Sequence, residues 1–329
     1  MENFPIKMTG NPIEKEDRVI LKDSVEEGIK FLHEEGKSPF PSEREKTEKE
    51  KKAIETSGAL LSAMFDRFKI PHEQNIVSDG QIHFFTKEDF EKEFQHVSLD
   101  VGGFHDGMRN AICLKDGNED APEGEKEIFD ISDMAHECIH LASRHSYQAI
   151  VGTDDSVVPF DYRVGYAMTT VTDGKPTRKF NGWNEGVVCI TQNFLFSDFL
   201  EELEKRTGIT KEMRQDSHYN RYAQNQDVVF DIAEAIGEYR KESPVRSMYR
   251  LIKGQFTGDM MPLRDIDDIF GKGSLDLLAE YKSVFGTKDD HRRDELIADY
   301  FRTNADDEEE RKRIGAEIEK LKQPIKEKE

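Results

Sequence analysis

The chain has 329 residues, of which 36% are hydrophobic and 35% charged, and its formal net charge is −21. A chain of this length can bury a sizeable core, and its 21 Phe and 10 Met argue against wholesale disorder. Because an acidic surface repels phosphate groups, we expect neither nucleic acid nor an anionic membrane as a partner. The composition does not predict an oligomeric state.

Signals for export or membrane insertion are lacking in the sequence. No apolar run approaches the ~20 residues that span a bilayer, and the opening MENFPIKMTGNPIEKEDR holds no apolar signal segment. The three cysteines, Cys113, Cys138 and Cys189, do not make a disulfide framework. We therefore expect a reduced, cytoplasmic protein, and a route of export that needs no signal peptide stays open.

The first 70 residues favour helices. Apolar residues at helical spacing predict a helix over 24–37. Ser42 and Glu45 have the spacing of a capping box and predict the start of a long helix that ends near Phe68. Its first half alternates charges and is expected to face solvent, whereas its second half carries an apolar stripe.

The pattern changes to strands between about 70 and 115. A turn at Asp79-Gly80 is followed by alternating residues, and the apolar run from Ala111 to Leu114 predicts a buried strand. A helix follows and contains MAHECIHLASRH, with Asp130 or Ser132 as its expected cap.

The remainder of the chain is predicted to be mainly helical. A hairpin turning at Asp173-Gly174 precedes a long helix from about Trp183 to Gly208, and further helices lead to a charged tail. This order favours an α+β fold with a small mixed sheet behind the HECIH helix and a helical C-terminal part. We expect three parts: a charged helical extension at 1–52, a central domain at 53–240 and a helical C-terminal extension with a charged tail at 241–329.

The motif HECIH has the chemistry of a zinc site. His136 and His140 are four residues apart, so both imidazoles lie on one face of a helix and can reach one ion. Glu137 lies beside that ion, where a general base for a metal-bound water belongs. The apolar residues on both sides of the motif indicate a buried helix, and buried His and Glu need a functional reason.

Three candidates for the third ligand follow the motif. His145 is five residues after His140, which rotates it away from the ligand face, and we interpret it as a helix-end residue. Asp154 or Asp155 lies in a glycine-threonine turn, but the sequence after it does not continue an aspzincin pattern. Glu185 begins a second helix, and it can reach the ion if the two helices pack face to face.

At these positions the sequence resembles the gluzincins, the thermolysin-like class of zinc peptidases, and in particular their small bacterial members, the minigluzincins. In that class an HExxH helix is joined by the glutamate of an Asn-Glu pair on the next helix. The matching residues are His136, Glu137, His140, Asn184 and Glu185.

The resemblance covers about residues 100–240 and implies a zincin-like fold, a bound Zn²⁺ and a peptide or protein substrate. It implies that Glu137 activates a zinc-bound water to hydrolyse a peptide bond, and that a tyrosine and a histidine after the glutamate helix assist the developing oxyanion. Tyr222 and His218 fit that place, four apart on one predicted helix face. Tyr162 and Tyr166 of the hairpin are rivals.

One position departs from the thermolysin-like pattern. An acidic residue four positions after the ligand glutamate should orient a zinc-bound histidine, but this chain has Cys189, and a thiol is a poor acceptor. We interpret Cys189 and Cys138 as small core residues. A peptide substrate is expected to pair with an edge strand near Phe104 to Leu114, before the metal helix.

A second class of function remains possible: a catalytically silent, zinc-stabilised binding or regulatory protein on a gluzincin scaffold. The presence of Glu137 argues against it, because a purely structural site needs no base. Cys189 and the charged flanks at about 1–52 and 305–329 keep it open, since these flanks have the composition of a covering prosegment or of partner-binding arms.

Overall fold

A computed structural model describes most of the chain, and every structural statement below concerns the described residues. They are residues 6–10, 15–35, 40–72, 76–95, 102–116, 123–151, 157–172, 175–207, 223–282, 288–303 and 307–322.

The chain forms two compact units. Unit 1 comprises Met1–Val164 and Thr191–His218, and unit 2 comprises Gly165–Ile190 and Tyr219–Glu329. These boundaries differ from those predicted from the sequence, at 52 and 240, and that three-part division stays a prediction.

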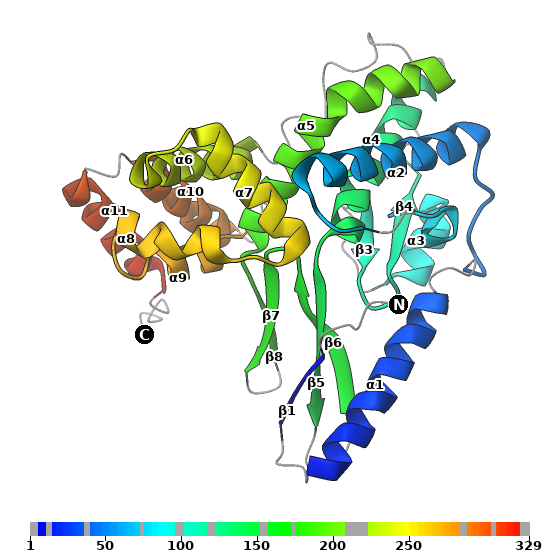
Figure 1. The fold of residues 1–329 in the computed structure, drawn as a ribbon, viewed down its shortest axis with the longest axis horizontal. Coiled ribbons are helices and arrows are strands. Elements are labelled where there is room, and N and C mark those ends of the chain that lie inside the picture. The colour runs from blue at the N-terminus through cyan, green and yellow to red at the C-terminus, as the bar shows by residue number, and fades with distance from the viewer. Residues whose placement is uncertain are drawn as a thin grey trace, which may run out of the picture. The chain divides into compact units, whose positions relative to one another are not determined.

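The architecture is mixed α and β, with helices predominating among the described residues (Figure 1). Unit 1 holds strands β1 (Ile6–Gly10), β2 (Ile82–Phe85), β3 (Gly103–Asp106), β4 (Ala111–Lys115), β5 (His145–Val151) and β6 (Val157–Val164), and helices α1 (Lys15–Glu35), α2 (Glu48–Phe68), α3 (Lys87–Glu93) and α4 (Glu123–Ala142). Unit 2 holds strands β7 (Ala167–Thr172) and β8 (Lys175–Lys179), and helices α6 (Ala223–Arg240), α7 (Pro244–Thr257), α8 (Ile266–Phe270), α9 (Ser274–Glu280), α10 (Lys288–Arg302) and α11 (Glu308–Lys322). Helix α5 (Asn181–Thr207) begins in unit 2 and continues in unit 1.

Helix α2 begins at a capping box, but five residues later than predicted. The hydroxyl of Thr47 accepts a hydrogen bond from the backbone N–H of Glu50, and the Glu50 carboxylate accepts one from the N–H of Thr47. The predicted pair, Ser42 and Glu45, is therefore wrong. Ser42 instead donates to the carboxylate of Glu93, so it serves the loop before the helix.

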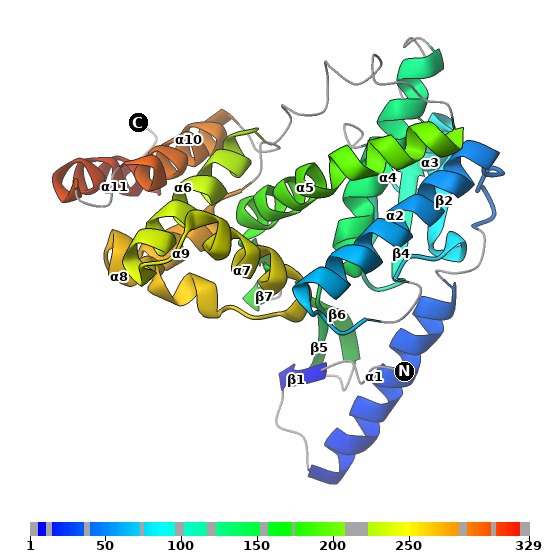
Figure 2. The same ribbon diagram turned by 45° about the horizontal axis from the view of Figure 1, so that its top comes forward.

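A three-stranded mixed sheet supports helix α4. Its order is β2-β4-β3, with β2 parallel and β3 antiparallel to β4. Helix α4 packs on β3 and β4, and α2 packs on α4, as Figures 1 and 2 both show. The small mixed sheet predicted behind the HECIH helix is thus present, although α4 begins at Glu123 and not at a cap formed by Asp130 or Ser132.

Two strand predictions need correction. The alternation expected after the turn at Asp79-Gly80 is wrong, because all four residues of β2 are buried. Its polar member, His83, tolerates burial because its Nδ1 lies 3.0 Å from a carboxylate oxygen of Glu43. The predicted edge strand from Phe104 to Leu114 is in fact two strands, of which β3 lies at an edge of this sheet and β4 is central.

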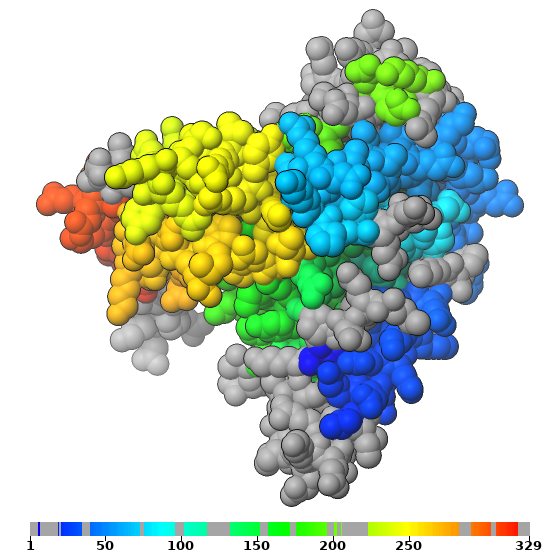
Figure 3. All heavy atoms as spheres, viewed as in Figure 1, coloured from blue at the N-terminus to red at the C-terminus, as the bar shows by residue number. Residues whose placement is uncertain are grey.

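A second group of strands in unit 1 is covered by the first helix. Strand β1 pairs in parallel with β5, and β6 pairs antiparallel with β5 on its other side. Val25 and Ile29 of α1 pack on β5 around the buried ring of Tyr147. Helix α1 extends the helix predicted over 24–37 to an earlier start, and its outer face is part of the surface in Figure 3.

Unit 2 is a hairpin followed by packed helices. Strands β7 and β8 pair antiparallel, which confirms the predicted hairpin, although Asp173 and Gly174 at its turn lie outside the described residues. Helix α6 packs against α7, α8 and α10, and α10 packs against α11. Among the helices of the described part of the chain, none has the length and apolarity needed to cross a membrane.

Candidate metal centre

Helix α4 presents two imidazoles side by side. The Nε2 atoms of His136 and His140 lie 3.2 Å apart, and both side chains are buried. The helix is held by its opposite face, where Met134 and Cys138 are completely buried. Burial raises the pKa of the Cys138 thiol well above its usual value, so the cysteine acts as a small core residue, as predicted.

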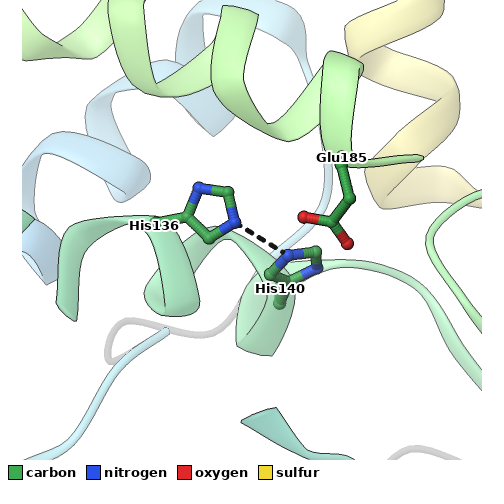
Figure 4. A group of neighbouring side chains, drawn as sticks. All are labelled: His136, His140 and Glu185. Atoms are coloured by element: carbon green, nitrogen blue, oxygen red, sulfur yellow. Dashed lines mark hydrogen bonds between the residues drawn. The ribbon is translucent and has the colours of Figure 1, made fainter. Parts of the chain in front are cut away.

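Helix α5 contributes a carboxylate to the same place. One ligand atom from each of His136, His140 and Glu185 lies within 4.8 Å of the others. Figure 4 shows the carboxylate of Glu185 pointing from its helix toward the two rings. The structure thus brings together the three residues that the sequence predicts as ligands.

The spacing of the two nitrogens fits a shared ion. Two imidazole nitrogens that each lie ~2.0–2.1 Å from a tetrahedral zinc are about 3.3 Å apart, and the observed separation of His136 and His140 is 3.2 Å. Two nitrogens and one carboxylate oxygen are a donor set that zinc accepts, and three protein ligands leave a fourth position for water or substrate. The residues therefore fit the group that the motif implies.

Asn184, the residue before Glu185, anchors the first turn of α5. Asn184 is completely buried, and its Oδ1 accepts hydrogen bonds from the backbone N–H of Tyr166 at 2.9 Å and from the Nε2 of Gln255 at 3.0 Å. Gly165 makes this contact possible, because its φ is +59° and a Cβ there would lie 2.1 Å from the Gln255 side chain. The Asn of the Asn-Glu pair is thus a structural residue that fixes the backbone beside Glu185.

A residue that the sequence analysis missed lies on the far side of His136. Gln192 of α5 places its Oε1 3.3 Å from the Nδ1 of His136. Its Nε2 donates to the carbonyl oxygen of Ser132 at 3.0 Å. The available signal was the spacing, since Gln192 follows Glu185 by seven residues, or two helical turns, and so shares its face of the helix.

His145 is not part of the ligand group. It lies at the start of β5 and not at a helix end as predicted, and its Nε2 donates to the carbonyl oxygen of His140 at 3.2 Å. Burial lowers the pKa of His145 to about 4, with the hydrogen bond to His140 opposing the shift. The ring is therefore neutral at physiological pH and closes the C-terminal end of α4 as a neutral donor.

The remaining predicted site residues have different outcomes. Glu137 lies half-buried on α4 between the two histidines in sequence. Tyr166 is wrong as an oxyanion donor, because its hydroxyl is completely buried and donates to the carbonyl oxygen of Leu251. Tyr162 is half-buried on β6, and Cys189 is buried on α5.

Four further candidates were predicted from the sequence. Asp154, Asp155, His218 and Tyr222 lie outside the described residues.

Comparison of the chain with models of protein families, with curated proteins and with solved structures gives no match.

Proposed function

We propose that this chain is a zinc-dependent peptide hydrolase of the gluzincin type, in which His136, His140 and Glu185 hold the ion. The observation that supports the proposal is the convergence of these three ligand atoms within 4.8 Å of one another, from two helices that are about 45 residues apart in sequence. A convergence of two buried His side chains and a half-buried Glu side chain is costly without an ion to neutralise the carboxylate and occupy the ring nitrogens.

The ion, when bound, would polarise a water molecule and the carbonyl group of a peptide substrate. Glu137 supplies the proton transfers: its carboxylate takes a proton from the attacking water and passes it to the leaving amine. Its place directly after His136 and its partial exposure suit this role, because a base must face both the ligand group and the substrate. Tyr222 and His218 remain the predicted donors to the oxyanion.

A peptide substrate would add a strand to the small sheet of unit 1. Within the described part of the chain, β3 is the edge strand on the side away from β2, and it packs against α4. The strand with which a substrate would pair is therefore β3, Gly103–Asp106, through its backbone N–H and C=O groups.

The decisive experiment combines metal content with hydrolysis. Wild-type protein should hold about one zinc per chain, and Glu137→Gln should keep that zinc while losing at least ~100-fold in the rate of cleavage of a susceptible peptide. Glu185→Ala should lose zinc, and His145→Ala should retain it. The hydrolase proposal fails if Glu137→Gln cleaves at the wild-type rate, and the ligand assignment fails if zinc is lost from His145→Ala but not from Glu185→Ala.

The alternative is a zinc-stabilised binding protein without catalytic activity. Two uncharged residues favour it: Cys189 stands at the sequence position of an orienting acid, and the amide of Gln192 contacts His136. Zinc bound at full stoichiometry together with no cleavage across a broad peptide library would select this alternative.

A further inference from the structure

We propose that Gln192 is a positioning residue that fixes the tautomer of His136. The Nε2 of His136 then carries a lone pair that faces the ligand group even in metal-free protein. This inference rests on the proposed function for the identity of the ion. Its structural basis is independent of that function, and all of the residues concerned, Ser132, His136, His140 and Gln192, belong to unit 1.

The orientation of the Gln192 amide is set by Ser132. A backbone carbonyl oxygen only accepts hydrogen bonds, so the group 3.0 Å from the carbonyl oxygen of Ser132 must be the NH₂ of Gln192. The Ser132 hydroxyl, 3.3 Å from the same nitrogen, provides a second partner. A flipped amide would place two acceptor oxygens against each other. The amide oxygen of Gln192 therefore faces His136.

The orientation of the amide then determines the proton position on His136. An amide oxygen only accepts, so the Nδ1 of His136, 3.3 Å away, must carry the hydrogen. In a neutral imidazole the other nitrogen then has a lone pair. This nitrogen, Nε2, is the one that faces His140 and the ligand group. The ring is in the form that a metal requires without any rearrangement.

The contact between the two rings assigns the opposite tautomer to His140. Because the Nε2 of His136 is an acceptor, the Nε2 of His140, 3.2 Å away, must be the donor between them. His140 would bind a metal through Nε2 only after its ring proton has moved to Nδ1, whereas His136 needs no such change. The two histidines of the motif thus differ in tautomer, and the contact between Gln192 and His136 causes this difference.

The charge of the positioning group also has a consequence. An acidic residue in this place raises the basicity of a histidine as a metal ligand and adds a negative charge to the site. The amide of Gln192 provides the same geometry without that charge. It can therefore orient His136, which the thiol of Cys189 does poorly, but it adds no negative charge to the site. Replacing Gln192 by Glu should therefore preserve metal binding, whereas an apolar replacement of similar size should not.

Two measurements on the full chain test the proposal. In metal-free protein with ¹⁵N-labelled histidine at about pH 8, imidazole NMR should show His136 with its proton on Nδ1 and His140 with its proton on Nε2, with assignments from His136→Gln and His140→Gln. The second measurement is the zinc dissociation constant, obtained by competition with a chromogenic chelator, and it should rise ~10–100-fold in Gln192→Leu.

Three variants separate positioning from packing. Gln192→Glu keeps an acceptor for His136 and should bind zinc within about threefold of wild type or more tightly, whereas a pure packing role would place it with Gln192→Leu. Ser132→Ala keeps the backbone carbonyl and should change the affinity by about threefold at most. Asn193→Leu replaces the next amide on α5, which points about 100° away, and should leave the affinity unchanged.

The proposal is overturned if the proton of His136 lies on Nε2 in the metal-free wild type, or if Gln192→Leu binds zinc as tightly as wild type. The NMR result on the wild type holds even where a variant fails to fold. If the tautomers and affinities behave as expected but no peptide is cleaved, the positioning role stands and the hydrolase proposal falls. If cleavage depends on Glu137 but the zinc affinity is the same in Gln192→Leu and wild type, the hydrolase proposal stands and the positioning role falls.

Discussion

Gln255 donates a hydrogen bond from its Nε2 to the Oδ1 of Asn184 at 3.0 Å, across 71 residues of sequence. The same oxygen accepts from the backbone N–H groups of Tyr166 and Ala167, so three donors depend on one buried amide. The residue that follows, Glu185, is a proposed metal ligand. The relationship shows how the interior of unit 2 fixes the helix turn that carries this carboxylate.

We expect Asn184→Ala to lower the free energy of unfolding by about 2–4 kcal/mol, because it leaves buried donors without an acceptor. Urea unfolding followed by circular dichroism measures this loss. Asn193→Ala is the matched control, since it removes an amide from a half-buried position on the same helix, and it should cost less than about 1 kcal/mol. Equal losses in the two variants would contradict the anchoring role of Asn184.

The docking of helix α1 depends on a buried tyrosine. The Tyr147 hydroxyl donates to the carbonyl oxygen of Gly107 at 3.1 Å, and the Nε2 of His33 lies 2.9 Å from the same hydroxyl. Because the single hydroxyl proton is used toward Gly107, His33 must be the donor to Tyr147. Burial, with the nearby Asp161 and Asp106, raises the pKa of Tyr147 far above its usual value, so this proton is retained at any ordinary pH.

We expect Tyr147→Phe to destabilise the protein by about 1–3 kcal/mol, because the carbonyl of Gly107 and the ring of His33 each lose a buried partner. Hydrogen exchange should accelerate in α1 before it does so in α4, since of these two helices α1 is the one that carries His33. Tyr239→Phe serves as the control: that hydroxyl is exposed and lies 3.5 Å from Asp268. Unchanged exchange in α1 of Tyr147→Phe would show that apolar packing alone holds the helix.

The charged cluster of Glu43, Lys46 and His83, which lies before and beside α2, should make the stability of the protein depend on pH. Burial by itself would raise the pKa of Glu43, but hydrogen bonds and attraction from His83 and Lys46 outweigh it and hold the pKa below the ordinary value of 4.5. A carboxyl group with a lowered pKa stabilises the fold above its unfolded pKa, and this contribution is lost as the pH falls through the folded pKa. The contribution of Glu43 is therefore complete at neutral pH and disappears below about pH 4.5.

We expect Glu43→Gln to lower the free energy of unfolding by about 1–3 kcal/mol at pH 7 and by less at acid pH. Urea unfolding at several values between about pH 3 and pH 7 gives the comparison. Glu48→Gln is a suitable control, because Glu48 is exposed and its partner Lys51 is also at the surface. Parallel stability curves for wild type and Glu43→Gln would contradict the assignment.

Local patterns predicted the ligand group better than they predicted the helix starts. The spacing of His136 and His140 determines their shared face once a helix forms, and the apolar flanks of the motif specify that helix. The start of α2 was misplaced because two capping boxes compete in the sequence. In the structure the Thr47 box has a further contact, because Arg44 binds the Glu50 carboxylate from outside the helix.

Contacts between distant segments account for what the sequence did not predict. The role of Gln192 requires α5 to lie against Ser132, 60 residues earlier, and no local pattern encodes that approach. The burial of His83 in β2 likewise depends on Glu43, 40 residues before it. His145 was excluded as a ligand from its spacing, but its place in β5 follows from strand pairing and not from helical periodicity.

Zinc should stabilise the folded chain if the ligand group binds it. A ligand that binds only the folded state raises the free energy of unfolding by about 2.7 kcal/mol at a concentration one hundred times its dissociation constant. Thermal unfolding with and without added zinc should therefore show a higher melting temperature, reversed by a chelator. His140→Ala should abolish the increase because it removes a buried ligand nitrogen. His72→Ala should retain it, since His72 pairs with the exposed carboxylate of Asp66 and is not part of the ligand group. An increase that survives in His140→Ala would locate the zinc elsewhere on this acidic chain.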